Sequence, residues 1–162
     1  MDFDAFYAAN YERIRRAMIL AFKDSPFAEE TTQEAFYRAL RRWAKVSRLD
    51  HPEAWTMVVA LNRGRDVLRR RRRHDSTAHI LVTAATKGSD EAMVDDRMAI
   101  MDLLASVSDR QREALVLRYI GELTIPEIAK VMGCAEGTVK STLHAAIGNA
   151  ADAEKGPASV SD

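Results

Sequence analysis

The stretch Thr124–Leu143 reads TIPEIAKVMGCAEGTVKSTL and has the spacing of two short helices joined by a tight turn. The apolar positions before the turn recur at i, i+3, i+4 and i+7, which is typical of one buried helix face. They are Ile125, Ile128, Ala129 and Met132. Gly133 can take the left-handed backbone that the turn requires, and a second helix is expected from Glu136, Gly137 and Thr138. The pattern predicts a helix-turn-helix, whose second helix fits the major groove of DNA.

The second helix of this motif has an inward and an outward face. Its expected inward positions are Val139, Leu143, Ala146 and Ile147, and its expected outward positions are Lys140, Ser141, His144 and Ala145. We expect the outward side chains to meet base edges. A helical hairpin that only packs is the alternative interpretation of the same spacing.

The composition is that of an ordinary globular chain, with 47% hydrophobic and 30% charged residues among 162. The longest apolar runs are far shorter than the roughly 20 residues that cross a bilayer. The acidic N-terminus lacks the basic start of a signal peptide. We therefore expect a cytoplasmic protein with no membrane insertion.

No constellation of residues in the sequence indicates catalysis. We find no nucleophile–base pair, no phosphate-binding glycine loop and no metal-ligand spacing, so we expect neither an enzyme nor a cofactor, metal or small-molecule substrate. The single cysteine, Cys134, excludes an internal disulfide framework. It is expected to be a small packing residue in the turn, with a redox role as the alternative.

The formal net charge of zero is unevenly distributed along the chain. Residues 1–75 carry 16 Lys and Arg against 11 Asp and Glu, a net charge of +5, and residues 76–162 carry 8 against 13, a net charge of −5. The first half is therefore expected to make most of the non-specific contact with a polyanion. Residues 75–96 are rich in Ser, Thr, Ala and acidic side chains and predict a flexible linker, and residues 154–162 predict a disordered tail.

Three helices are expected in the first half. The first has an apolar stripe of Phe3, Tyr7, Tyr11, Ile14, Met18 and Phe22 and ends before Ser25-Pro26. The second has an inward stripe of Thr32, Ala35, Phe36, Ala39 and Trp43. The third begins near Pro52, with Ala54, Val58, Leu61 and Leu68 facing inward.

The third helix also carries groups suited to unpaired DNA. Trp55 and Asn62 share it with a run of arginines, which are Arg63, Arg65 and Arg69 to Arg73. An aromatic face can stack on an unpaired base while arginines follow the phosphate backbone. The alternative is that Trp55 belongs to the core and the arginines form a solvated end.

Two blocks of motifs resemble bacterial sigma factors of the extracytoplasmic-function (ECF) type, which retain only regions two and four. The first block runs from Ala28-Glu29-Glu30 through Gln33-Glu34-Ala35-Phe36 and Pro52-Glu53-Ala54-Trp55 to the arginine run. The second contains Leu103-Leu104, Arg110-Gln111-Arg112, Leu115 to Tyr119 and the helix-turn-helix. The resemblance covers nearly the whole chain, with the blocks in the family's order.

The resemblance implies a specificity subunit that binds core RNA polymerase and directs promoter recognition and opening. Residues 1–74 would bind the polymerase clamp and the minus-10 element, with a flipped base held between Lys45 and His51. Residues 97–153 would bind the minus-35 element. The implied polymerase-binding residues are Glu30, Gln33, Glu34, Arg38 and Arg41. The implied minus-10 residues are Lys45, Arg48, His51, Trp55, Asn62, Arg63, Asp66, Arg69 and Arg70. The implied minus-35 residues are Thr124, Glu136, Thr138, Lys140, Ser141 and His144.

The sequence departs from the family pattern at two places. Thr31 and Thr32 replace an aliphatic pair in the second helix, where we expect looser packing. Thr142 and Ala145 stand where relatives commonly carry arginines, so the recognition helix is poor in basic residues. Loss of phosphate contacts would lower DNA affinity and its salt dependence.

The expected fold is all-α, with two small helical bundles joined by a flexible linker and a helix-turn-helix in the second. Bundles of this size bury a limited core. Core RNA polymerase and promoter DNA are the expected partners, and an anti-sigma factor is a possible one. Two other hypotheses stay open: a helix-turn-helix regulator that never engages polymerase, and a sigma-like module that binds only proteins.

Overall fold

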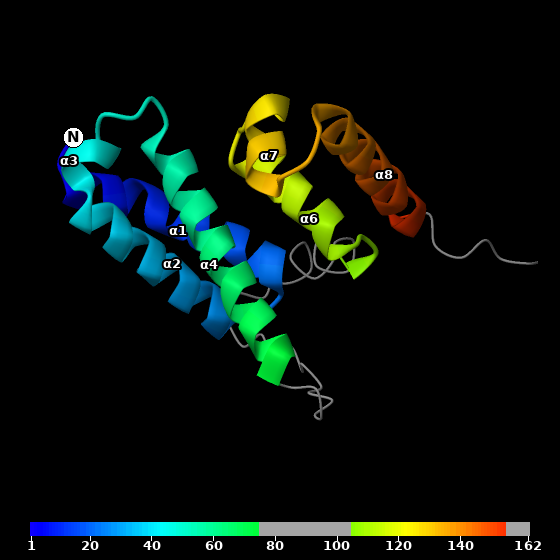
Figure 1. Cartoon of the computed structure of the whole chain (residues 1–162), viewed down its shortest axis with the longest axis horizontal. Helices are drawn as coiled ribbons and strands as arrows, with labels where there is room; N and C mark the ends of the chain where they lie inside the picture. The colour runs from blue at the N-terminus through cyan, green and yellow to red at the C-terminus, as the bar shows by residue number, and fades with distance from the viewer. Residues whose placement is uncertain (75–104, 155–162) are drawn as a thin grey trace, which may run out of the picture. The chain divides into compact units, whose positions relative to one another are not determined.

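The computed structural model describes residues 1–74 and 105–154, and every regular element in these ranges is a helix (Figure 1). The chain divides into two compact units, Met1–Thr86 and Lys87–Asp162. The predicted linker, the Leu103-Leu104 pair and the predicted tail beyond Glu154 lie outside the described residues. The all-α prediction is confirmed.

The first unit is a bundle of three long helices and one short one. These are α1 (Phe3–Phe22), α2 (Ser25–Arg41), α3 (Trp43–Val46) and α4 (Pro52–His74). α1, α2 and α4 pack against one another in all three pairs, and short connections make successive long helices run in opposite directions (Figure 1). Asp24 is the last residue of the connection between α1 and α2. Its carboxylate accepts a hydrogen bond from the Phe27 N–H and so caps the N-terminus of α2.

Aromatic side chains fill one end of this bundle. The centre of the Trp43 ring lies 4.9 Å from the centre of the Phe6 ring. Trp43 also meets the Phe3 ring edge-on, with 5.4 Å between the ring centres. Phe6 is fully buried, whereas Tyr7 is 39% exposed. The predicted stripe on α1 was therefore wrong at this turn, because Phe6 rather than Tyr7 points between α2 and α3.

The predicted inward stripe of α4 was also wrong, except at Leu61. The buried positions are Thr56, Met57, Ala60, Leu61 and Gly64, while Ala54, Val58 and Leu68 are half-buried. Gly64 explains the difference, because a Cβ atom there would lie 2.2 Å from Cζ of Phe22. The absence of a side chain at Gly64 allows α4 to approach α1 closely on this face.

The two threonines that depart from the family pattern are fully packed, with exposures of 1% for Thr31 and 0% for Thr32. Both hydroxyls donate to the carbonyl oxygen of Ala28, at 3.0 Å and 2.7 Å. Burial of these polar groups is compensated within α2 itself. The expectation of looser packing at this pair was wrong.

The second unit contains α6 (Asp109–Leu115), the π-helical turn η1 (Val116–Ile120), α7 (Ile125–Met132) and α8 (Glu136–Glu154). Ser108 with Gln111 and Thr124 with Glu127 form capping boxes at the starts of α6 and α7. Gly133 ends α7 with φ of 63°, the left-handed conformation predicted for the turn. The helix-turn-helix prediction is confirmed.

The core of the second unit lies among α6, η1, α7 and α8, and α8 packs against both α6 and α7. Ala114, Leu117, Ile128, Val139 and Ala146 are fully buried. Ile147, predicted to face inward, is 50% exposed. It lies about 80° around the helix from Val139, at the edge of the buried stripe of α8.

Candidate nucleic-acid interface

The outer face of α2 carries the residues predicted to bind polymerase. Glu30, Gln33, Arg38 and Arg41 are exposed and Glu34 is half-buried. Arg38 Nε lies 2.7 Å from Glu34 Oε1, so these two charges are already paired. Arg38 therefore partly compensates the charge of Glu34 on this face.

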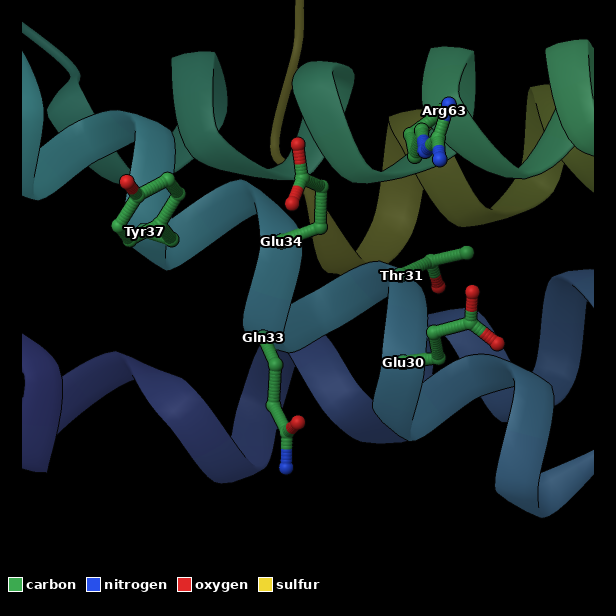
Figure 2. Close-up of a pocket in the computed structure, with 6 residues that line it drawn as sticks. All are labelled: Glu30, Thr31, Gln33, Glu34, Tyr37 and Arg63. Atoms are coloured by element: carbon green, nitrogen blue, oxygen red, sulfur yellow. The ribbon is translucent and has the colours of Figure 1, made fainter.

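A shallow groove of about 280 Å³ lies along α2 and is lined by Glu30, Thr31, Gln33, Glu34, Tyr37 and Arg63. Figure 2 shows Glu34 and Tyr37 on the side of α2 toward α4, where Arg63 lies, while Gln33 points the other way. The structure thus brings Arg63, predicted to follow DNA, to the same groove as three residues predicted to bind polymerase. Arg38 and Arg41 lie outside this groove.

Two residues of this face were missed by the sequence analysis. Tyr37 is 55% exposed and Leu40 is 50% exposed, and the Arg41 guanidinium lies 5.9 Å from the centre of the Tyr37 ring. Exposed large apolar side chains beside charged ones are typical of a protein-binding surface. Their i, i+3 spacing on the polar side of α2 was the signal that could have identified them.

An ion pair on α1, between Glu12 and Arg15, lowers the pKa of Glu12. Arg15 donates two hydrogen bonds to the Glu12 carboxylate, at 2.9 Å and 2.8 Å. These bonds, aided by Arg16, lower the pKa of Glu12 to about 2. Glu12 is therefore an ionised, locally compensated carboxylate that offers little attraction to a cationic partner.

Three predicted minus-10 residues precede α4: Lys45 lies in α3, and Arg48 and His51 lie in the connection between α3 and α4. All three are exposed, and His51 Nδ1 lies 3.3 Å from Glu53 Oε1 in the first turn of α4. The Trp55 N–H donates to the His51 carbonyl oxygen at 3.2 Å, so His51 is tied to the first turn of α4, which also carries Trp55.

The two tryptophans of this unit have different environments. Trp43 packs on Phe3 and Phe6, whereas Trp55 is half-buried and contacts no other aromatic ring within the described ranges. Asn62, two helical turns after Trp55, is exposed. Trp55 and Asn62 therefore place an aromatic and a polar side chain on the same partly exposed side of α4.

The arginines that end α4 differ in what they contact. Asp66 Oδ1 lies 3.7 Å from Arg69 Nη1, and Arg71 covers the Phe27 ring with its guanidinium carbon 4.9 Å from the ring centre. Arg70 is exposed. The structure therefore separates one arginine that packs on the core from others that face solvent.

The predicted minus-35 residues fall on two helices. Glu136, Thr138, Lys140, Ser141 and His144 are exposed along α8, and Ser141 Oγ donates to the Thr138 carbonyl oxygen at 3.0 Å. Thr124 lies instead at the start of α7, where its hydroxyl donates to Glu127 Oε2 at 2.7 Å. α8 thus presents a polar face on which Lys140 is the sole lysine or arginine.

Arginines of the second unit are bonded to the backbone around the helix-turn-helix. Arg110 Nη2 donates to the Met132 carbonyl oxygen at 3.1 Å, and Arg118 Nη1 donates to that of Leu123 at 2.8 Å. The first bond reaches the last residue of α7, and the second reaches the connection between η1 and α7. These two arginines therefore contribute to the structure around the helix-turn-helix.

Neither a metal centre nor a membrane span is found where the structure can be described. No group of three or more potential ligands lies together within residues 1–74 and 105–154. No helix in those ranges is long and apolar enough to cross a membrane.

The two helical units, one with a helix-turn-helix, match the two parts of a single class of bacterial transcription proteins. Residues 6–74 match the family model for sigma-70 region 2, and residues 97–148 match that for sigma-70, region 4. The chain belongs to the ECF-type sigma factors of RNA polymerase.

Curated relatives span most of this chain. It is 27% identical to the RNA polymerase sigma-E factor of Streptomyces avermitilis, covering 91% of this chain and 82% of that protein. It is 28% identical to the ECF RNA polymerase sigma factor SigK of Mycobacterium sp. strain KMS (90% and 81%) and 26% identical to the ECF RNA polymerase sigma factor SigM of Bacillus subtilis strain 168 (90% and 91%).

A solved structure has the same fold. The sigma factor RpoE from Bartonella quintana, determined in complex with the anti-sigma factor NepR, superposes with a TM-score of 0.76 at 24% identity. The match covers 96% of this chain and 98% of that one.

Proposed function

We propose that this chain binds core RNA polymerase through α2 and directs promoter recognition and opening through α4 and α8. Residues 1–74 act as region two and residues 97–153 as region four, joined by residues 75–96. The observation that supports the proposal is the groove lined by the α2 face and Arg63, which brings residues assigned to polymerase and to DNA together. The matches to both sigma regions support it.

The polymerase-binding surface consists of Glu30, Gln33, Glu34, Arg38 and Arg41, and we add Tyr37 and Leu40. The last two supply exposed apolar area, and the charged residues supply the orientation of the partner. A partner with cationic side chains would meet Glu30 and Glu34 in the groove. The role of this surface is recruitment, which keeps α4 close to promoter DNA.

The minus-10 surface combines Trp55 and Asn62 with two groups of polar residues. The residues that precede α4 are Lys45, Arg48 and His51. The charged residues of α4 are Arg63, Asp66, Arg69 and Arg70. An unpaired base stacks on an aromatic face for about 1 to 3 kcal/mol. Binding of the open strand therefore shifts the equilibrium of the duplex toward melting. Asp66, which faces Arg69, serves to orient that arginine.

The minus-35 surface is the outward face of α8, with Glu136, Thr138, Lys140, Ser141 and His144, together with Thr124. Its hydroxyl, imidazole and ammonium groups can meet base edges and phosphates. Because Lys140 is its single lysine or arginine, region four adds little counterion release. Tethering by polymerase compensates by raising the local concentration of this helix near DNA.

The protein carries out no bond chemistry of its own and acts in the cytoplasm with the polymerase. An anti-sigma factor is a further proposed partner, since the structure of the similar fold contains one. Such a protein would inhibit by covering the α2 face.

Binding of the full chain to core RNA polymerase tests the proposal. Glu30→Lys with Glu34→Lys should weaken binding by about tenfold or more, because both carboxylates line the groove. Glu122→Lys with Asp152→Lys makes the same change in charge at exposed sites of the second unit and is the control. Equal binding by both double variants would contradict the assigned surface, and no binding by the unmodified chain would contradict the function.

A further inference from the structure

Asn62 on α4 is held by a neighbouring arginine. Arg65 Nη2 donates a hydrogen bond to Asn62 Oδ1 at 2.5 Å. The two residues are three positions apart, so they lie one above the other on the helix. Arg65 is half-buried and Asn62 is exposed, so the arginine is the more constrained partner.

The chemistry of the guanidinium group determines which end of the Asn62 amide it meets. Arginine has five N–H donors and no acceptor, so only the amide oxygen of Asn62 can face it. The NH₂ group, with two donors, is then directed away from Arg65. Asn62 therefore presents itself to a ligand chiefly as a hydrogen-bond donor.

We propose that Arg65 is a positioning residue that fixes the Asn62 amide so that its NH₂ group meets an acceptor on promoter DNA. The inference rests on the proposed function of α4 and extends it to the polarity of one contact. Acceptors on unpaired bases include N7 and O6 of guanine, N1, N3 and N7 of adenine, the carbonyl oxygens of thymine, and O2 and N3 of cytosine. Free rotation of the amide would remove this selection, because the oxygen could then accept from an exocyclic amine.

Asp66 cannot take over the role of Arg65. Its carboxylate is an acceptor, so it would attract the NH₂ end of Asn62 and reverse the amide. It lies instead within 3.7 Å of Arg69. Arg65 and Asp66 therefore have different partners on α4: Arg65 orients Asn62, and Asp66 faces Arg69.

The test is a double-mutant cycle in the full chain bound to core RNA polymerase. Binding is measured on forked promoter DNA in which each minus-10 base is replaced in turn. Asn62→Ala should abolish the preference for an acceptor at one base position. Arg65→Ala should reduce the same preference by about three- to tenfold, the range expected for one hydrogen bond. In the Asn62→Ala background, Arg65→Ala should leave base preference unchanged.

Two further variants separate orientation from charge. Arg70→Ala removes an exposed arginine from the same helix and should weaken binding to all sequences equally, without altering preference. Arg65→Lys keeps a donor for the Asn62 oxygen and should restore part of the preference. Thermal unfolding of each variant checks that α4 stays folded.

The outcomes distinguish this inference from the proposed function. A wild-type complex with base preference that Arg65→Ala leaves intact, or lowers uniformly as Arg70→Ala does, overturns the positioning role alone. Retention of the preference by Asn62→Ala also overturns it. A wild-type complex with no base preference contradicts the proposed function of α4, and the positioning role with it.

Discussion

Phe22 of α1 occupies the space that a side chain on Gly64 of α4 would need. A Cβ atom on Gly64 would lie 2.2 Å from Cζ and 2.4 Å from Cε2 of the Phe22 ring. The Phe22 ring meets the Phe27 ring edge-on, with 5.2 Å between the ring centres. We infer that this close contact helps to set the rotation of α4, and with it the side of the helix on which Trp55 and Asn62 lie.

Gly64→Ala is therefore expected to destabilise the first unit. Alanine has a better helix propensity by about 1 kcal/mol, but overpacking of a close contact costs about 1 to 3 kcal/mol, and we expect the second effect to be larger because three atoms of the Phe22 ring lie within 3.0 Å of the added Cβ. Thermal or denaturant unfolding measures the difference. Gly148→Ala is the matched control, because Gly148 is exposed in α8 with nothing within 4 Å of its added Cβ, and it should stabilise the chain. A gain of stability from Gly64→Ala would contradict the account of how α4 is oriented.

Arg71 is expected to contribute to folding and Arg72 only to DNA binding. Arg71 lies 4.9 Å from the centre of the Phe27 ring, and cation–π contacts contribute about 0.5 to 1 kcal/mol at exposed sites. Arg71→Ala should lower the free energy of unfolding by this amount, while Arg72→Ala, at an exposed position, should leave it unchanged. Chemical denaturation of the two variants makes the comparison, since each removes one positive charge. Equal stabilities would show that the ring contact has no effect.

Among the cations of the second unit, Lys140 is expected to affect DNA binding and Arg118 is expected to affect stability. Lys140→Ala removes the one lysine of the outward face of α8, so the slope of log affinity against log salt concentration should fall in magnitude by about 1. Arg118→Ala should leave that slope unchanged and lower stability by about 1 kcal/mol, because its guanidinium is bonded to the Leu123 carbonyl oxygen. Affinities for promoter DNA are measured with the polymerase complex at several salt concentrations. A reduced slope for Arg118→Ala and an unchanged slope for Lys140→Ala would reverse the assignment.

Several helix boundaries were predictable because local chemistry sets them, although Trp43, expected on the second helix, begins α3. Asp24 with Pro26 begins α2, Pro52 begins α4, and Gly133 ends α7 with a left-handed residue. These signals act within one helical turn, so no knowledge of the tertiary fold is required. The order of the helices and the helix-turn-helix follow from them.

The faces of the helices were less predictable, because packing between distant residues decides them. The sequence pattern of α4 allowed several apolar stripes, and the contact of Gly64 with Phe22 selected one of them. On α8, Ile147 fits a helical period but is 50% exposed, so it lies outside the buried stripe. Tyr37 and Leu40 were missed for a related reason, since their exposure depends on what the bundle leaves uncovered.

The assignment of individual residues to polymerase, minus-10 and minus-35 contacts stays a prediction, as do the domain boundaries at residues 74 and 97. The structure adds constraints to it. Arg63 shares a groove with Glu30 and Glu34, Asn62 is bonded to Arg65, and Thr124 lies apart from α8 at the start of α7.

Run-off transcription on a library of promoters, with the full chain and core RNA polymerase, tests the central claim most directly. We expect transcripts from a defined subset of promoters and their loss with Glu30→Lys and Glu34→Lys, while Glu122→Lys and Asp152→Lys preserve them. A folded chain that yields no promoter-dependent transcript, with core enzyme that responds to another sigma factor, would contradict the claim that α2 recruits polymerase and α4 opens DNA.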